Sequence, residues 1–160
     1  LAKRTTALVA VGHQVRDDLL KAGIGRPEQY SVIAPGVTMG SVPESRRSRE
    51  ELDLPADSPV ILFVGRLEPV KRPDRLIQAM SIVLEEVPDA VLVVAGGGAE
   101  LKDLSILAKP LGTAVRFLGW RAEINLLYGS ADVVVITSDN EGMPVTLIEA
   151  ALAGLPVVAI

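Results

Sequence analysis

Short runs of β-branched and apolar residues alternate with longer amphipathic stretches from about residue 60 to the end of this 160-residue chain. This order is typical of β-α-β units, in which helices bury both faces of a parallel sheet. The sequence therefore predicts an α/β fold with a parallel sheet and helices on both faces. The expected strands are Val60–Gly65, Ala90–Gly96, Ala114–Gly119, Asp132–Thr137 and Pro156–Ile160, and the expected helices lie near Arg72–Val87, Glu100–Lys109, Arg121–Ala131 and Pro144–Ala153.

The residues before this region follow a different pattern. They indicate one partial β-α-β unit, followed by a linker that is rich in proline, serine and charge and holds at least one helical turn. We expect the boundary between about Gly36 and Pro59, with residues 1–40 in one part and residues 41–160 in the other. One β-α-β unit cannot bury its own faces. The first part therefore either belongs to a sheet whose other strands are missing here or packs on the main domain.

Composition narrows the classes of function. A net charge of −4 gives no basic surface for nucleic acid, and the arginines of Arg46–Arg49, offset by nearby glutamates, predict a solvated helix face. The lack of cysteine excludes disulfides and cysteine-based zinc sites and fits a cytoplasmic setting. No apolar window is long enough for a transmembrane helix, so we expect no membrane contact from this segment.

Two cations follow the first strand of the main domain. Open parallel sheets bind ligands at the carboxyl ends of their strands, near the point where the strand order reverses. Arg66 comes directly after this strand, and Lys71 precedes a helix that begins near Pro73. An arginine fork, a lysine charge and free N–H groups at a helix start suit a diphosphate. Two surface cations without a ligand would give the same pattern.

Glycines and a tryptophan follow the next two strands. The run Gly96–Gly98 allows either the close approach of a ligand or a tight turn, because glycine permits both, and it lacks the spacing of a dinucleotide fingerprint. Trp120 and Arg121 follow the third strand. The tryptophan either covers a nucleobase or caps the core.

Two glutamates follow the fourth strand. Glu141 lies in the loop, and Glu149 lies inside an otherwise apolar helix. A carboxylate at such a position needs a polar partner, because its desolvation is costly. Sugar hydroxyls of a ligand would satisfy Glu149, and so would an ion pair with Arg66 or Lys71.

In this order, the segments VGRLEPVKRPDRLI, GGGAELKDL, VRFLGW and EGMPVTLIEAALAGLPVVA resemble the donor-binding domain of retaining glycosyltransferases of family 4, the group 1 transferases of the GT-B fold. The resemblance runs from about Ser31 to Ile160, and its most specific part is the E-x7-E element from Glu141 to Glu149. In such enzymes two Rossmann-like domains face each other across a cleft. The resemblance implies that residues 41–160 are the nucleotide-sugar-binding Rossmann-like domain, truncated at its C-terminal end. Residues 1–40 would be a remnant of the N-terminal acceptor-binding domain and the start of the linker.

The resemblance also implies roles for individual residues. Arg66 and Lys71 would bind the diphosphate and stabilise charge on the leaving nucleoside diphosphate, while Glu141 would contact the donor sugar. These three are the expected catalytic residues. The expected substrate-binding residues are Gly97 at its strand end, Trp120 and Arg121 near the base, Glu149 on the ribose hydroxyls, and Gly142, Met143 and Pro144 beside the sugar.

The reaction implied by the resemblance moves a sugar from a uridine or guanosine diphosphate donor to an acceptor hydroxyl, with retention and without a metal or other cofactor. No Asp-x-Asp motif occurs, and the one histidine, His13, is expected at a helix start or on the surface. A sugar, lipid or small-molecule acceptor would bind the missing N-terminal domain, so the fragment alone should not turn over. The alternatives are a non-catalytic nucleotide-binding or assembly module of the same fold, and a receiver-like signalling module, which the basic first strand end disfavours.

Overall fold

The computed structural model describes residues 4–160, and these form two compact units. The first unit holds the residues up to Val37 together with the loop Glu141–Val145, and the second holds Thr38–Asn140 and Thr146–Ile160. Along the first part of the chain, the division between the units falls between Val37 and Thr38. That the first residues derive from an acceptor-binding domain stays a prediction.

The first unit contains a two-stranded parallel sheet. Its elements in chain order are β1 (Leu8–Ala10), α1 (His13–Lys21), the 3-10 helix η2 (Pro27–Gln29) and β2 (Tyr30–Val32). Among its described residues only Ala10 is buried, whereas Val9 and Ile33 are 62% and 58% exposed. The unit therefore leaves apolar sheet residues open to solvent, as expected for one β-α-β unit. His13 begins α1 and is exposed, in agreement with its predicted position.

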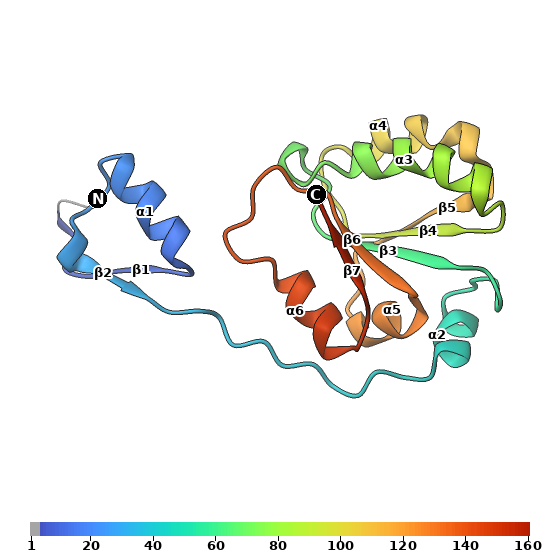
Figure 1. The fold of residues 1–160 in the computed structure, drawn as a ribbon, viewed down its shortest axis with the longest axis horizontal. Coiled ribbons are helices and arrows are strands. Elements are labelled where there is room, and N and C mark those ends of the chain that lie inside the picture. Colours follow the sequence, from blue (N-terminus) through green and yellow to red (C-terminus); the bar gives the residue numbers. More distant parts are fainter. Residues whose placement is uncertain (1–3) are drawn as a thin grey trace. The chain divides into compact units, whose positions relative to one another are not determined.

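The second unit is built on a five-stranded parallel sheet with the order β5-β4-β3-β6-β7 (Figure 1). From β3 the chain moves outward to β5 on one side, then returns to β6 and continues to β7 on the other. The strand order thus reverses at β3 and β6, where open α/β sheets bind ligands. The strands are β3 (Val60–Val64), β4 (Val91–Ala95), β5 (Val115–Gly119), β6 (Val133–Ile136) and β7 (Val157–Ala159).

Helices cover both faces of this sheet (Figure 1). Leu62 packs with α5 and α6 on one face, whereas its neighbour Phe63 packs with α3 and α4 on the other, because successive strand residues point in opposite directions. The predicted α/β fold is confirmed. The helices of this unit are α2 (Ser45–Glu51), α3 (Pro73–Glu86), α4 (Leu101–Leu107), α5 (Ile124–Ser130) and α6 (Val145–Leu152), with 3-10 turns η3 (Pro69–Lys71) and η4 (Lys109–Ala114).

Arg49 of α2 corrects one expectation from the sequence. Its neighbours Arg46 and Arg47 are exposed and pair with glutamates one turn later, but Arg49 is only 6% exposed. Its guanidinium forms an ion pair with Asp132 at 2.7 Å, and the same carboxylate oxygen accepts the backbone N–H of Val60. It also donates to three backbone carbonyls, those of Ala56, Ser58 and Ser130. Arg49 therefore joins the linker to the amino ends of β3 and β6.

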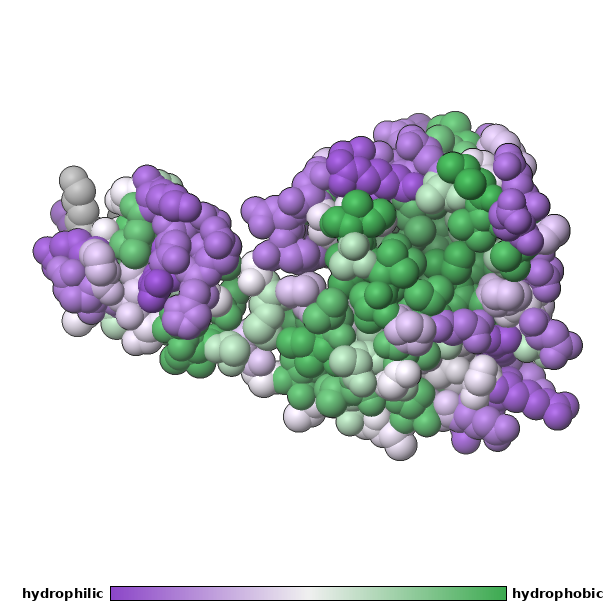
Figure 2. Space-filling model, viewed as in Figure 1, coloured by the Kyte–Doolittle hydropathy of each residue, from purple (hydrophilic) through white to green (hydrophobic). Residues whose placement is uncertain are grey.

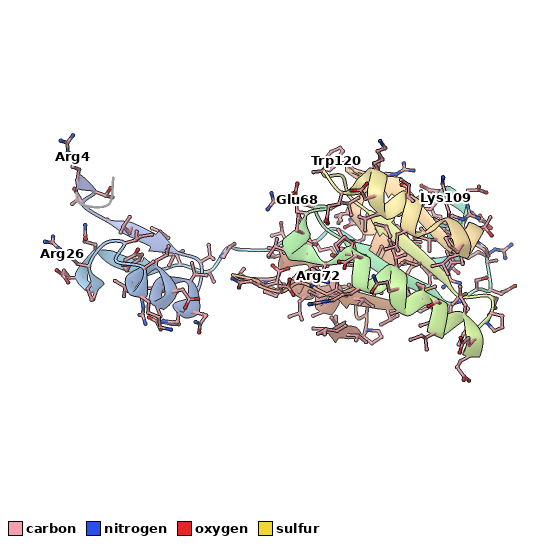
Figure 3. All side chains as sticks on the ribbon, turned by 90° about the horizontal axis from the view of Figure 1, so that it is seen from above. Arg4, Arg26, Glu68, Arg72, Lys109 and Trp120 are labelled. Atoms are coloured by element: carbon pink, nitrogen blue, oxygen red, sulfur yellow. The ribbon has the colours of Figure 1, made fainter. Side chains whose placement is uncertain are left out.

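The first turn of α3 is fixed by a second group of charges, around Arg72 (Figure 3). Arg72 has a left-handed backbone with φ 49°, a conformation that non-glycine residues seldom adopt. Its side chain pairs with Asp74 at 2.9 Å and with Asp139 at 3.5 Å, and Asp139 also pairs with Arg75 at 2.7 Å. The start of α3 is thereby tied to the loop that follows β6.

Apolar side chains gather on one face of the second unit, over α6 and β7 (Figure 2). They include Leu152, Val158 and Ile160, which are exposed. β7 is an edge strand, paired with β6 alone in the described sheet. None of the helices formed by residues 4–160 combines the length and the apolar character needed to span a membrane.

We expect Arg49→Met to lower the free energy of unfolding by about 2–4 kcal/mol, because three carbonyls and a carboxylate lose a buried charged donor. Urea unfolding followed by circular dichroism measures this. The matched control on the same helix is Arg46→Met, which removes one exposed ion pair and should change the free energy by less than ~0.5 kcal/mol. Equal losses in the two variants would show that Arg49 does not hold the linker.

Asp74 gives a prediction about pH. The hydrogen bond from Arg72 is the largest of the effects that hold the pKa of Asp74 below its ordinary value. A lowered folded-state pKa adds stability above the unfolded pKa of about 4, and this stability is lost as the pH falls through the folded value. Asp74→Asn should therefore lower the melting temperature by about 1–2 °C at pH 7, since a partly exposed pair contributes little, and this difference should vanish in acid.

Thermal melts between pH 3 and pH 7 measure the difference, with Asp103→Asn, an exposed aspartate in the first turn of α4, as the control. If the melting temperature of Asp74→Asn stays below that of the wild type by the same amount down to pH 3, the lowered pKa of Asp74 is contradicted.

Candidate functional site

A cavity of about 360 Å³ opens at the carboxyl ends of the central strands. Four of the residues singled out in the sequence line it, namely Arg66, Gly97, Trp120 and Arg121. The rest of the lining is largely apolar and comes from the ends of β3 and β4 and from α5. The cavity thus joins an apolar interior to two arginines and lies where an α/β sheet is expected to bind a ligand.

The glycine run after β4 allows two stretches of backbone to pack closely together. A side chain on Gly96 would overlap the carbonyl oxygen of Gly65, and one on Gly98 would overlap the backbone of Leu67. Gly97 faces open space at the cavity, and its carbonyl oxygen accepts the N–H of Leu67 at 2.9 Å. Two of the glycines are therefore needed for backbone packing, and the middle one leaves the cavity open.

Trp120 does not cap the core. It is 78% exposed and lies at the edge of the domain, although it lines the cavity (Figure 3). Trp120 and Arg121 lie in a loop after β5, and α5 begins at Ile124 instead of the expected Arg121. The indole therefore offers an exposed aromatic surface beside an arginine.

The two predicted phosphate ligands differ in their surroundings. Within residues 4–160 the guanidinium of Arg66 makes no ion pair, and Arg66 lines the cavity two residues after β3 ends at Val64. Lys71 ends η3, and its backbone carbonyl accepts a hydrogen bond from Thr137 at the end of β6. The backbone of Lys71 is thus attached to the neighbouring strand, at the point where the strand order reverses.

Glu149 has a partner that the sequence did not suggest. Its Oε2 accepts a hydrogen bond of 2.7 Å from the hydroxyl of Tyr128 on α5, and within the described residues it pairs with neither Arg66 nor Lys71. Burial raises the pKa of Tyr128 above its ordinary value, and the hydrogen bond to Glu149 raises it further. Of the two partners that the sequence left open for Glu149, the ion pair is therefore not formed. The signal that was missed is a tyrosine in an apolar helix, whose hydroxyl needs a partner when it is buried.

The start of α6 is attached to the central strand. The hydroxyl of Thr146 donates to the backbone carbonyl of Val64 at 3.2 Å, and Val64 lines the cavity. Glu149 lies on the same helix one turn later and is partly buried. This contact attaches the helix of Glu149 to a residue of the cavity lining, although Glu149 itself is not among the lining residues.

The remaining predicted residues belong to the first unit. Glu141, Gly142, Met143 and Pro144 lie in the loop Glu141–Val145, and none of them lines the cavity. Their roles beside a donor sugar stay predictions. Chemically, the cavity can hold a flat apolar group, with two arginines for an anion.

The sequence matches known proteins over most of its length. The family described as glycosyl transferases group 1 matches residues 44–160. A D-inositol 3-phosphate glycosyltransferase of Xylanimonas cellulosilytica is 36% identical over 96% of this chain, and one of Corynebacterium jeikeium is 40% identical over 80% of it. The chain spans 40% and 34% of the lengths of these two relatives.

Solved structures have the same architecture. HepE of Anabaena in complex with UDP-glucose superimposes with a TM-score of 0.84 at 29% identity, covering 99% of this chain and 46% of that protein. WaaG, a glycosyltransferase involved in lipopolysaccharide biosynthesis, superimposes with a TM-score of 0.83 at 26% identity, covering 95% and 43%. The sheet is therefore that of one half of a GT-B fold, and the chain belongs to the group 1 family of glycosyl transferases.

Proposed function

We propose that this chain is the donor-binding part of a retaining glycosyltransferase of family 4, which moves a sugar from a nucleoside diphosphate to an acceptor hydroxyl. The observation that carries the proposal is the cavity at the strand ends. Arg66, which makes no ion pair within residues 4–160, lines this cavity, and an exposed indole lies beside it. The family match and the UDP-glucose in the HepE structure support it, and they favour UDP as the nucleotide.

The two cations account for the diphosphate in this proposal. Arg66 offers a planar fork of donors, and Lys71 adds a point charge from the loop attached to β6. Negative charge grows on the leaving diphosphate as the sugar departs, so positive groups fixed beside it lower the barrier. This is also the basis for proposing a reaction without a metal: two fixed side-chain cations supply the charge.

The hydroxyl groups of the donor require acceptors. Glu149 accepts hydrogen bonds from the ribose, and Trp120 and Arg121 lie against the base, with Gly97 leaving room for the backbone to approach. The sequence resemblance supports a further role for Glu141, with Gly142, Met143 and Pro144, on the donor sugar. Transfer with retention then needs no carboxylate that attacks the sugar. The acceptor hydroxyl approaches the face that the diphosphate leaves, and a departing phosphate oxygen takes its proton.

We expect the protein to bind UDP, and Arg66→Ala to weaken this binding about 10- to 100-fold, the cost of a lost charge-assisted hydrogen bond. Isothermal titration calorimetry measures the dissociation constants. Lys71→Ala should also weaken the binding of UDP. Arg46→Ala and Lys102→Ala, both exposed on other helices, are the matched controls and should bind UDP as the wild type does. Arg66→Ala binding as tightly as its control would refute the diphosphate site.

A second prediction concerns the metal. Release of UDP from UDP-glucose by the full-length protein should have the same rate in EDTA as in magnesium, within about twofold, if Arg66 and Lys71 supply the charge that a metal supplies elsewhere. Nuclear magnetic resonance of the product should show the donor's anomeric configuration. Activity that disappears in EDTA and returns with magnesium or manganese would contradict the metal-independent mechanism. UDP binding without any sugar transfer would favour the non-catalytic alternative.

A further inference from the structure

Tyr128 is a polar residue inside the core of the second unit. It is 1% exposed and packs among apolar residues from the sheet and from α6. Phenylalanine in place of this tyrosine would pack equally well. A buried hydroxyl costs free energy unless it has a hydrogen-bond partner. The hydroxyl lies 2.7 Å from Oε2 of Glu149 and 3.5 Å from the backbone carbonyl oxygen of Thr146, and it donates its proton to the nearer carboxylate oxygen. The hydroxyl therefore serves the carboxylate, since packing does not require it.

This contact limits how Glu149 can turn. A carboxylate has two equivalent oxygens, and an isolated one on a helix can rotate and exchange them. Here Oε2 is engaged by Tyr128, which leaves Oε1 to accept from another donor. Within residues 4–160, Glu149 has no other side-chain donor. Because burial and Glu149 both raise the pKa of Tyr128, the phenol stays protonated at neutral pH and acts as a permanent donor.

One of the two helices lines the cavity. Ile124 and Leu127, on the helix of Tyr128, belong to the cavity lining, and Leu127 is the residue directly before it. The helix of Glu149 is attached through Thr146 to Val64, which also lines the cavity. Tyr128 and Glu149 therefore link α5, which lines the cavity, to α6, which is attached to a strand that lines it.

We propose that Tyr128 is a positioning residue for ribose recognition: its hydroxyl holds Oε2 of Glu149 so that Oε1 is directed to the ribose hydroxyls of the bound nucleotide. This inference rests on the proposed function, in which Glu149 accepts from the ribose. Tyr128 does not touch the ligand. It reduces the conformational freedom that Glu149 would lose on binding, and such preorganisation increases affinity.

The test compares UDP with 2′,3′-dideoxy-UDP, which lacks the two ribose hydroxyls, by titration calorimetry. The wild type should prefer UDP. Tyr128→Phe keeps the ring and removes only the hydroxyl, so it should bind UDP about 5- to 10-fold more weakly and dideoxy-UDP within about twofold of the wild type. When Glu149→Ala is already present, adding Tyr128→Phe should not weaken the binding of UDP any further. Tyr30→Phe is the matched control, because its hydroxyl donates to the carbonyl of Ile24 in the first unit.

The outcomes separate the two hypotheses. A wild type that binds neither nucleotide, or binds both equally, overturns the ribose role of Glu149 and this inference with it. If Glu149→Ala removes the preference for UDP but Tyr128→Phe keeps it, the site stands and the role of Tyr128 is refuted. Equal weakening of both nucleotides by Tyr128→Phe would show a merely structural role. Should that variant lose its cooperative melt, Glu149→Asp, which withdraws the carboxylate from the phenol, must lose the UDP preference.

Discussion

The close approach of two backbones at the carboxyl ends of β3 and β4 is the constraint on which the rest of the site depends. Gly96 passes against the carbonyl of Gly65, and Gly98 passes against Leu67, so neither position has space for a side chain. Hydrogen bonds from Gly65 to Ala95 and from Leu67 to Gly97 hold the two chains together. Arg66 lies between two of these anchored residues. Its backbone is therefore fixed before any ligand arrives, as preorganised catalysis requires.

Buried polar contacts hold neighbouring elements together at both ends of the sheet, but the groups that take part differ. At the amino ends of the strands, the guanidinium of Arg49 meets backbone carbonyls and Asp132 and fastens the linker. Near the carboxyl ends, the phenol of Tyr128 meets Glu149. In the first case all the partners are protein groups, so the contact is structural. In the second, one carboxylate oxygen remains available, which leaves the contact open to a ligand.

The loops around the cavity are held by contacts to neighbouring strands and helices. The backbone carbonyl of Lys71 accepts from Thr137, and the charges of Arg72, Asp74 and Asp139 fix the turn that leads into α3. The left-handed backbone of Arg72 costs free energy, and these ion pairs offset that cost. A glycine at the same place could not make them. Loops attached in this way have little conformational freedom left to lose, which favours ligand binding where a loop takes part in it.

The sequence by itself determined the order of strands and helices and the chemical types at the strand ends. It could do so because hydrophobic periodicity, glycine and proline act locally. Arg66, Gly97, Trp120 and Arg121 were found because residues after parallel strands must meet at one edge of a sheet. Only the tertiary structure decided the partners. That Arg49 is buried, that Trp120 is exposed and that Glu149 meets Tyr128 depend on how α2 and α5 pack on the sheet, and residues 83 and 21 positions apart are brought together by that packing alone.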